Sequence, residues 1–290
     1  MFRFIQILGI FFAFTFLFSA YTKWISPGYF EITLMDQNLA DTRIFAAYLA
    51  RFIIGLELAL GLSLLLPFYR RILLSIAMLM IVIFTLHLLY MVSLGDTENC
   101  GCFGELIALS PLESVAKNLI LLLMAAILYK KSRFQKRAPK TVMILSFFFL
   151  VIPWVQLPIQ DYDSFVFNDY SHFEKVGRVD LTAGDKLVGI FNLDCEHCQE
   201  AASKLANWER EKKKKIPLYA LYFKQGSKTV AEFEGQTQST FPYAFIDDKT
   251  FFELIGSSPP RIYYLKKGEV QAYWDKEFIK NIQNSGIELK

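Results

Sequence analysis

The sequence predicts a two-part protein, in which a bundle of membrane-spanning helices is followed by an α/β domain. Hydrophobic residues make up 53% of the 290 residues, and they are concentrated before residue 160. Several apolar runs in that part reach the roughly 20 residues that a membrane helix needs. After residue 160 the chain alternates short apolar strands with helical stretches, which is the α/β pattern. We therefore expect a four-helix membrane bundle, a fifth spanning helix and a terminal α/β domain.

Five apolar segments are candidates for membrane spans. They cover residues 4–22, 45–66, 72–94, 113–129 and 141–158. The fifth contains Pro153, which a membrane helix tolerates. The first could alternatively be a signal peptide with Arg3 as its basic region, but Phe18 is a poor residue at the third position before a cleavage site, so we favour a retained span. Within the loop before the fourth span, Ser110 to Glu113 fits a capping box with Pro111 at the first helical position.

The positive charges predict the orientation of the bundle. Arg70 and Arg71 follow the second span, and six basic residues lie in the linker after the fourth, within residues 130–140. No Lys or Arg lies between residues 95 and 110. We expect the N-terminus and the basic loops in the cytoplasm, and the 95–110 loop and everything after the fifth span outside the cytoplasmic membrane. The expected divisions are a four-helix domain at 1–130, a basic linker and fifth helix at 131–160, and a periplasmic domain at 161–290.

The cysteines form two close pairs, Cys100 with Cys102 and Cys195 with Cys198. Close pairing indicates redox chemistry or metal binding, and both pairs fall in the compartment that permits disulfides. Cys100 and Cys102 are separated by Gly101 alone, so their Cα atoms are at most about 7 Å apart, near the upper end of the disulfide range. A bond across this glycine would be strained, and strained disulfides are the labile, oxidising kind. An inert disulfide, two unrelated thiols and copper binding remain alternatives.

The second half of the chain reads as alternating strands and helices. We expect strands at 186–191, 216–223 and 242–247, and a further strand in 261–270 with a hairpin turn at Gly268. Helices are expected at 199–215, directly after the second cysteine pair, and at 248–256.

The motif Cys195-Glu-His-Cys198 lies where a predicted strand meets a predicted helix. A helix N-terminus stabilises a thiolate on the first cysteine, and the second cysteine can then resolve a mixed disulfide. Asp194 is a candidate N-cap, and protonated His197 would lower the thiol pKa further. Glu196 would oppose ionisation of the thiol.

Residues 162–285 resemble the thioredoxin-like superfamily. The resemblance rests on the CEHC motif at the strand-to-helix junction and on Pro260, which lies eight residues before Gly268. It implies that Cys195 and Cys198 are the redox pair, with His197 beside them. It also implies that Pro260 is a cis-proline that flanks the active site and shapes its groove. Asp194 replaces the tryptophan that usually precedes the first cysteine.

Residues 1–130 resemble the DoxX/MauE group of small four-helix membrane proteins. The residues that carry this resemblance are FSAYTKW at 18–24, ELALGL at 57–62 and CGCFGE at 100–105, followed by SPLESVAKN. MauE-type proteins are associated with disulfide formation in periplasmic enzymes of methylamine metabolism. The resemblance therefore implies a redox-associated membrane module and leaves its substrate open.

Four charged residues are candidates for roles in the membrane. Arg51 and Glu57 are six residues apart in the second span, so they do not share a helix face and are not expected to pair. Lys23 and Lys117 lie near the ends of the first and fourth spans, where either could pair with Glu57 or favour a thiolate at the Cys100–Cys102 loop. A structural ion pair is the alternative reading. His87 is expected to be a hydrogen-bonded interior residue.

These observations predict a membrane-bound protein disulfide oxidoreductase. Electrons would pass between Cys195–Cys198 and Cys100–Cys102, with exported protein thiols or another periplasmic redox protein as partner and a membrane quinone as a further electron carrier. The reverse flow, from the membrane to a periplasmic reductase, and a non-enzymatic copper-handling module remain alternatives. The net charge of +3 gives no indication of nucleic-acid binding.

Overall fold

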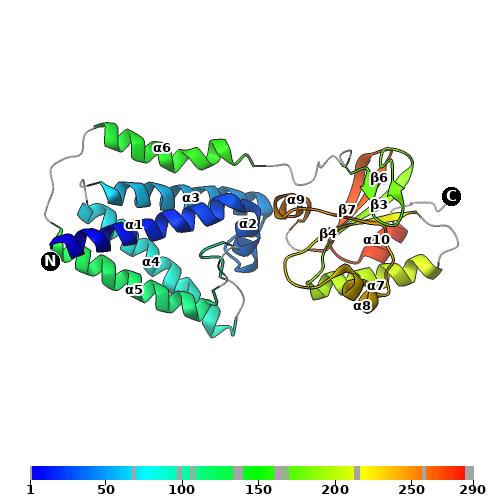
Figure 1. Ribbon diagram of the computed structural model, residues 1–290, viewed down its shortest axis with the longest axis horizontal. Helices are drawn as coiled ribbons and strands as arrows, with labels where there is room; N and C mark the ends of the chain where they lie inside the picture. The colour runs from blue at the N-terminus through cyan, green and yellow to red at the C-terminus, as the bar shows by residue number, and fades with distance from the viewer. Residues whose placement is uncertain are drawn as a thin grey trace. The chain divides into compact units, whose positions relative to one another are not determined.

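The computed structural model describes residues 2–66, 70–96, 100–104, 107, 109–132, 140–159, 167, 170–211, 216–256 and 259–284. It divides into two compact units, Met1–Ile159 and Gln160–Lys290. The first unit is helical and the second is α/β, as the sequence predicts (Figure 1).

The first unit contains six described helices. They are α1 (Phe2–Ile25), α2 (Pro27–Asp36), α3 (Arg43–Leu65), α4 (Arg70–Ser93), α5 (Pro111–Lys131) and α6 (Lys140–Gln156). Among the described residues, α1, α3, α4 and α5 are long and apolar enough to span a membrane. Their facing sides share one apolar core that includes Phe12, Leu60, Leu74 and Leu121. The four expected spans of the bundle are thus confirmed, and the protein is a multi-pass membrane protein.

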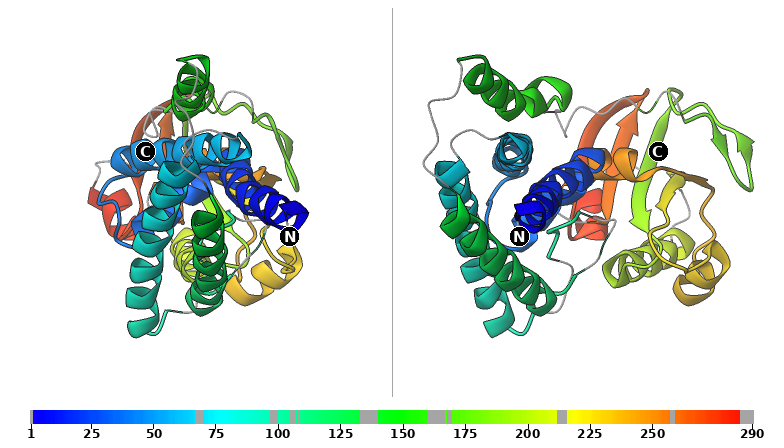
Figure 2. Two further views of the ribbon diagram at one scale, coloured as in Figure 1. Left: turned by 90° about the vertical axis from the view of Figure 1, so that its left-hand side faces the viewer. Right: turned by 60° about the vertical axis from the view of Figure 1, so that its left-hand side comes forward.

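Helix α6 lies alongside α3 on the side away from α4 and α5 (Figures 1 and 2). An added Cβ at Gly55 would overlap the carbonyl oxygen of Leu150, so only glycine permits this approach. Ser63 and Ser146 are joined through their hydroxyls at 2.8 Å. Because α6 has 17 residues, it is about 26 Å long and falls short of the roughly 30 Å hydrocarbon core. The fifth span stays a prediction.

Helix α2 is an element that the sequence reading did not anticipate. It begins after Ser26 with Pro27 at its first position, a start signal that was present in the sequence. It places Phe30 and Leu34 against Ala50 and Ile54 of α3. The capping box expected at Ser110 is present at the start of α5, with both reciprocal hydrogen bonds formed.

The second unit is built on a five-stranded mixed sheet with order β5-β4-β3-β6-β7. Its strands and those of a small separate hairpin are β1 (His172–Phe173), β2 (Gly177–Arg178), β3 (Asp185–Asn192), β4 (Leu218–Phe223), β5 (Tyr243–Phe245), β6 (Arg261–Lys266) and β7 (Glu269–Trp274). Its helices are α7 (Glu196–Glu211), α8 (Val230–Thr237), α9 (Asp248–Leu254) and α10 (Phe278–Asn284). β3 pairs parallel with β4 and antiparallel with β6.

The sheet is covered on both faces. One face packs against α7, α8 and α10 through Leu205, Phe233 and Ile282. Alternate residues of β4 point to the other face, where Phe223 stacks on Phe251 of α9 at 4.3 Å. The expected strands and the helices at α7 and α9 are confirmed, whereas α8, α10 and the β1–β2 hairpin were missed. The expected end of α7 at residues 212–215 lies outside the described residues.

Candidate active site

The CEHC motif occupies the predicted junction, because β3 ends at Asn192 and α7 begins at Glu196. Cys195 directly precedes the helix and takes the N-cap position. The backbone N–H of Cys198 donates to its sulfur at 3.4 Å. The expected N-cap role of Asp194 was wrong. Its carboxylate accepts instead from the backbone N–H groups of Gly226 at 2.8 Å and Lys228 at 3.2 Å, which ties this turn to the loop after β4.

The two thiols of this motif are held in different electrostatic states. A hydrogen bond from the Cys198 thiol, helped by backbone N–H groups and the charge of His197, lowers the pKa of Cys195 to about 6. Burial raises the pKa of Cys198, which is fully enclosed and whose sulfur accepts from the Asn192 N–H at 3.3 Å. Cys195 is only half-buried. The half-buried thiol is therefore the more readily ionised of the two, and the buried thiol is suited to resolve a mixed disulfide.

A groove of about 630 Å³ adjoins the motif. His197 and Glu200 of the α7 side line it together with Pro260 and with Phe278 of α10. The peptide bond between Pro259 and Pro260 is cis, as predicted. The volume lies within the usual range of ligand pockets, so the groove has room for a ligand beside His197 of the motif.

The second cysteine pair lies in the connection between α4 and α5. We call its residues Cys100–Cys102 the CGC loop. Gly101 adopts φ +67°, and an added Cβ would lie 2.6 Å from Thr33 Cγ2 of α2. The backbone N–H of Cys100 donates to the Leu109 carbonyl at 2.9 Å. Its carbonyl accepts from Gln37 Nε2 at 3.0 Å. Thus α2 holds the loop from one side, and a glycine is required at the point of closest approach. Glu98, Asn99 and Glu105 of the motif lie outside the described residues.

A buried ion pair supports the other end of the CGC loop. Lys23 Nζ of α1 lies 3.0 Å from both carboxylate oxygens of Glu57 in α3. The ammonium of Lys23 and the hydroxyl of Ser19 each donate to the Cys102 carbonyl at 2.9 Å. Lys23 is 2% exposed and Glu57 5% exposed, so the pair is shielded from solvent. Of the two lysines considered for Glu57, the structure selects Lys23.

The thiols of the CGC loop are also held in different electrostatic states. The hydrogen bond from Cys100, followed by the charges of Lys117 and Lys23, lowers the pKa of Cys102 well below its ordinary value, although burial acts in the opposite direction. The same hydrogen bond, together with burial, raises the pKa of Cys100. The Cys100 sulfur lies 2.9 Å from the Ser114 hydroxyl of α5. Lys117 Nζ lies 4.3 Å from the centre of the Phe103 ring.

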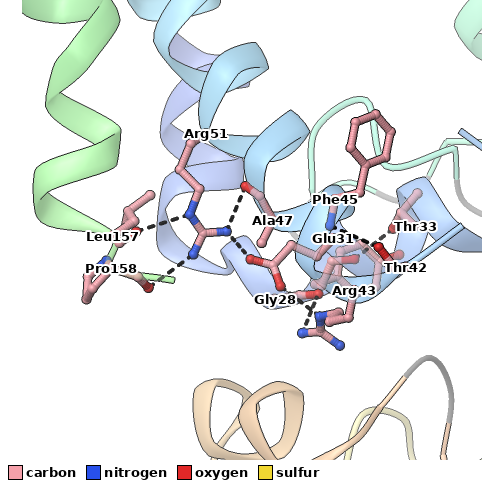
Figure 3. Close-up of polar contacts among 11 residues, drawn as sticks. Gly28, Glu31, Thr33, Thr42, Arg43, Phe45, Ala47, Arg51, Leu157 and Pro158 are labelled. Carbon is pink, nitrogen blue, oxygen red and sulfur yellow. Dashed lines mark hydrogen bonds and ion pairs between the residues drawn. The ribbon is translucent and has the colours of Figure 1, made fainter. Parts of the chain in front are cut away.

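Arg51 belongs to a different site from Glu57, as their spacing predicts. Figure 3 shows its guanidinium between Glu31 of α2 and the C-terminal end of α6. It donates to the carbonyls of Leu157 at 3.1 Å and Pro158 at 3.3 Å. Arg43 donates to the second oxygen of Glu31 at 2.8 Å. Arg51 thus fixes the point where α6 ends, and it has no contact with a cysteine among the described residues.

The sequence reading missed several residues of these sites. They are Ser19, Glu31, Gln37, Arg43 and Ser114. Glu31 carried a usable signal, because it is a lone carboxylate in the apolar run Phe30–Met35. Ser19 and Ser114 carried none, since a serine in an apolar helix is common. His87 is hydrogen-bonded to Gln37 Oε1 at 3.2 Å, as expected, but it is half-buried and not an interior residue.

Comparison with known families finds a match for the first unit. Residues 1–131 match the family described as "Methylamine utilisation protein MauE". This part of the chain is therefore similar to that family. The match ends at the last residue of α5, so the matched region contains both supports of the CGC loop and excludes α6. The chain is also similar to "Protein TlpB" of Flavobacterium psychrophilum, with 24% identity over 330 aligned residues that cover 92% of this chain and 90% of that protein. That similarity therefore extends across both units.

Proposed function

We propose that the protein is a membrane-bound thiol–disulfide oxidoreductase that supports disulfide formation in exported proteins. The observation that carries the proposal is the matching asymmetry of the two cysteine pairs. In each pair one thiol has a lowered pKa and its neighbour a raised one. Structural disulfides need no such asymmetry, whereas exchange requires a ready nucleophile and a resolving thiol.

The exchange begins at oxidised Cys195–Cys198. A client thiolate attacks Cys195, and Cys198 leaves as a thiolate. The second client thiolate then attacks the client sulfur of the mixed disulfide, which releases Cys195 and completes the client disulfide. The client has lost two electrons and two protons, and the CEHC pair is reduced.

Reoxidation of the CEHC pair involves the CGC loop. The Cys195 thiolate attacks the Cys100–Cys102 disulfide, and one CGC thiol leaves. Cys198 then attacks Cys195, so that the CEHC disulfide reforms and the CGC loop carries two thiols. The CGC loop is in this scheme the electron acceptor of the CEHC pair.

The chain length between the two units is compatible with this relay. Nine residue steps lead from Pro158, where Arg51 holds the chain, to Phe167, which packs against Tyr263 of β6. Such a segment spans at most about 32 Å. A tether of this length keeps two reactive groups at an effective concentration on the order of millimolar. Exchange within one chain would then outcompete exchange between chains.

The charge distribution supports a location in the cytoplasmic membrane, with both cysteine pairs on the outer face. Basic residues flank the opposite ends of the helices, at Arg70 and Arg71 of α4 and at Lys130 and Lys131 of α5. The outer face is the side where exported proteins acquire disulfides.

Trapping of the mixed disulfide tests the proposal. In the full chain, Cys198→Ser removes the resolving thiol and should accumulate adducts of Cys195 with the CGC loop and with exported proteins on non-reducing gels. The double variant Cys195→Ser/Cys198→Ser is the matched control and should form none. Absence of any Cys195-linked adduct would refute the relay.

Thiol alkylation in intact cells determines the direction of flow. Both pairs should be found as disulfides at rest if the protein is an oxidase. Two reduced pairs would instead show that the membrane unit delivers electrons to a reductase, which would overturn the proposed direction.

A further inference from the structure

A cavity lies inside the first unit, directly beneath the CGC loop. Cys100, Gly101 and Cys102 all line it. The remaining wall comes from α1, α2, α3, α4, α5 and a few residues in the adjoining loops. Both thiols therefore border a space inside the helical bundle in addition to the loop surface.

The side chains that line the cavity are mainly apolar, and a few of them carry hydrogen-bond donors. The apolar part includes Phe16, Phe30, Leu34, Met80, Phe84 and Leu121. The side chains that carry N–H donors are Lys23, Gln37, His87, Lys117 and Asn118. Such a lining fits a flat apolar ligand with oxygen acceptors at its edge.

One donor is available for such a ligand. Among the described residues Lys117 has no carboxylate partner, and its ammonium lies over the Phe103 ring. Its charge is also one of the causes that stabilise the Cys102 thiolate. Lys117 therefore lines the cavity, acts on the Cys102 sulfur through its charge, and makes no hydrogen bond to another described residue.

The position of the wall along the helices points to a ligand from the lipid phase. Phe84 and His87 line the cavity and are only half-buried. They precede the last residue of α4, Ser93, by nine and six residues, which is roughly 14 and 9 Å along the helix. At that depth in a membrane-spanning helix, the exposed part of a side chain faces lipid.

We propose that this cavity binds the ring of a membrane quinone and that the CGC thiols deliver their electrons to it. The inference rests on the proposed function and names the next electron acceptor of the same site. Two electrons and two protons pass from Cys100 and Cys102 to the quinone. The S–S bond forms, and the two quinone carbonyls become the hydroxyls of the quinol. The disulfide is then ready for another exchange with the CEHC pair.

The size of the cavity limits how the ring is held. Its volume is about 80 Å³, below the roughly 150 Å³ of a protein cavity that encloses benzene. The ring enters by its reactive edge, and its isoprenoid tail remains in the bilayer. A larger side chain at Phe84 should therefore block entry.

Binding to the full chain in lipid nanodiscs tests the site apart from turnover. The Cys100→Ser/Cys102→Ser variant removes the redox reaction, and short-tail benzoquinone and naphthoquinone analogues serve as separate probes. We expect saturable binding of at least one probe, measured by equilibrium dialysis. Phe84→Trp should raise its Kd by at least about 10-fold, a loss of roughly 1.4 kcal/mol. Leu86→Trp is the matched control, since Leu86 is 63% exposed on the same helix and lies outside the cavity wall.

The outcomes separate this inference from the proposed function. Saturable binding that Phe84→Trp weakens and Leu86→Trp leaves unchanged supports the site. Lack of saturable binding, or equal effects of the two tryptophans, overturns it even if Cys195 adducts form. If neither binding nor adducts are observed, the proposed function fails as well.

Discussion

The ionisation of Cys195 gives a prediction that can be worked out quantitatively. The pKa of this thiol is lowered from its ordinary value near 9 to about 6. The largest cause is the hydrogen bond from Cys198. Cys195 should therefore react as a thiolate at pH values where ordinary thiols are protonated.

The size of the effect depends on pH because two factors oppose each other. At pH 5 a thiol of pKa 6 is about 1,000 times more ionised than one of pKa 9, but its lower basicity reduces its intrinsic reactivity roughly 15- to 30-fold. We expect Cys195 to react about 30 to 60 times faster than a cysteine peptide at pH 5. At pH 7 the ratio of ionised fractions is only about 90, so the expected advantage falls to roughly 3- to 6-fold.

The assay is the rate of reaction with methyl methanethiosulfonate between pH 4 and 9. Cys100→Ser/Cys102→Ser/Cys198→Ser leaves Cys195 as the single thiol and keeps a hydroxyl donor beside it. The matched variant carries Cys198→Ala instead and lacks the donor, so its pKa should move back toward the ordinary value. A midpoint above pH 8 in the serine variant, or identical midpoints in the two variants, would refute the reasoning.

Three further predictions concern the membrane unit. Glu57→Gln leaves Lys23 buried without its counter-charge and should cost about 3–5 kcal/mol of stability; Lys23→Met/Glu57→Leu should cost less than Glu57→Gln alone, measured by thermal unfolding in detergent. Gly101→Ala should lower the free energy of unfolding by about 1–2 kcal/mol because residue 101 has a left-handed backbone, and further because the added Cβ clashes with α2. Gly95→Ala is the control, since Gly95 has φ +78° with no atom within 4 Å of an added Cβ, and equal losses would contradict the clash. Ser114→Ala removes a hydrogen bond that lowers the pKa of both CGC thiols. The pH midpoint of thiolate absorbance at 240 nm should therefore rise, whereas an unchanged midpoint would exclude this role.

The features that could be predicted from the sequence are those that depend on residues close together in the chain. The apolar runs of α1, α3, α4 and α5 give the spans, because the bilayer fixes the length that such a helix must have. The CEHC motif was placed correctly because a buried strand leads directly into it. The capping box at Ser110 could likewise be predicted, since its two residues, Ser110 and Glu113, lie within four positions of each other.

The features that escaped prediction depend on contacts between distant residues. Glu57 and Lys23 are 34 positions apart, and the sequence could not decide between Lys23 and Lys117. The misassigned N-cap has a similar cause. The carboxylate of Asp194 accepts hydrogen bonds from the backbone N–H groups of Gly226 and Lys228, which are more than 30 residues away. These bonds take the place of the expected bond to the start of α7. The local sequence predicts which side chains can form hydrogen bonds with the backbone, but the tertiary structure determines which backbone groups become their partners.

In both cysteine pairs a hydrogen bond from the neighbouring thiol is the main stabiliser of the thiolate, and the surroundings decide what supplements it. Cys195 lies at the start of α7, where backbone N–H groups and a neighbouring thiol stabilise a partly solvated thiolate. The CGC loop is enclosed, and the Cys100 N–H is already committed to Leu109. Full charges supplement the hydrogen bond from Cys100 there: a charge 4 Å away is worth about 1 kcal/mol in water but about 4 kcal/mol at an effective dielectric constant near 20. Lys117 and Lys23 are thus effective where they lie because the loop is buried, and Glu57 offsets the cost of keeping one of them there.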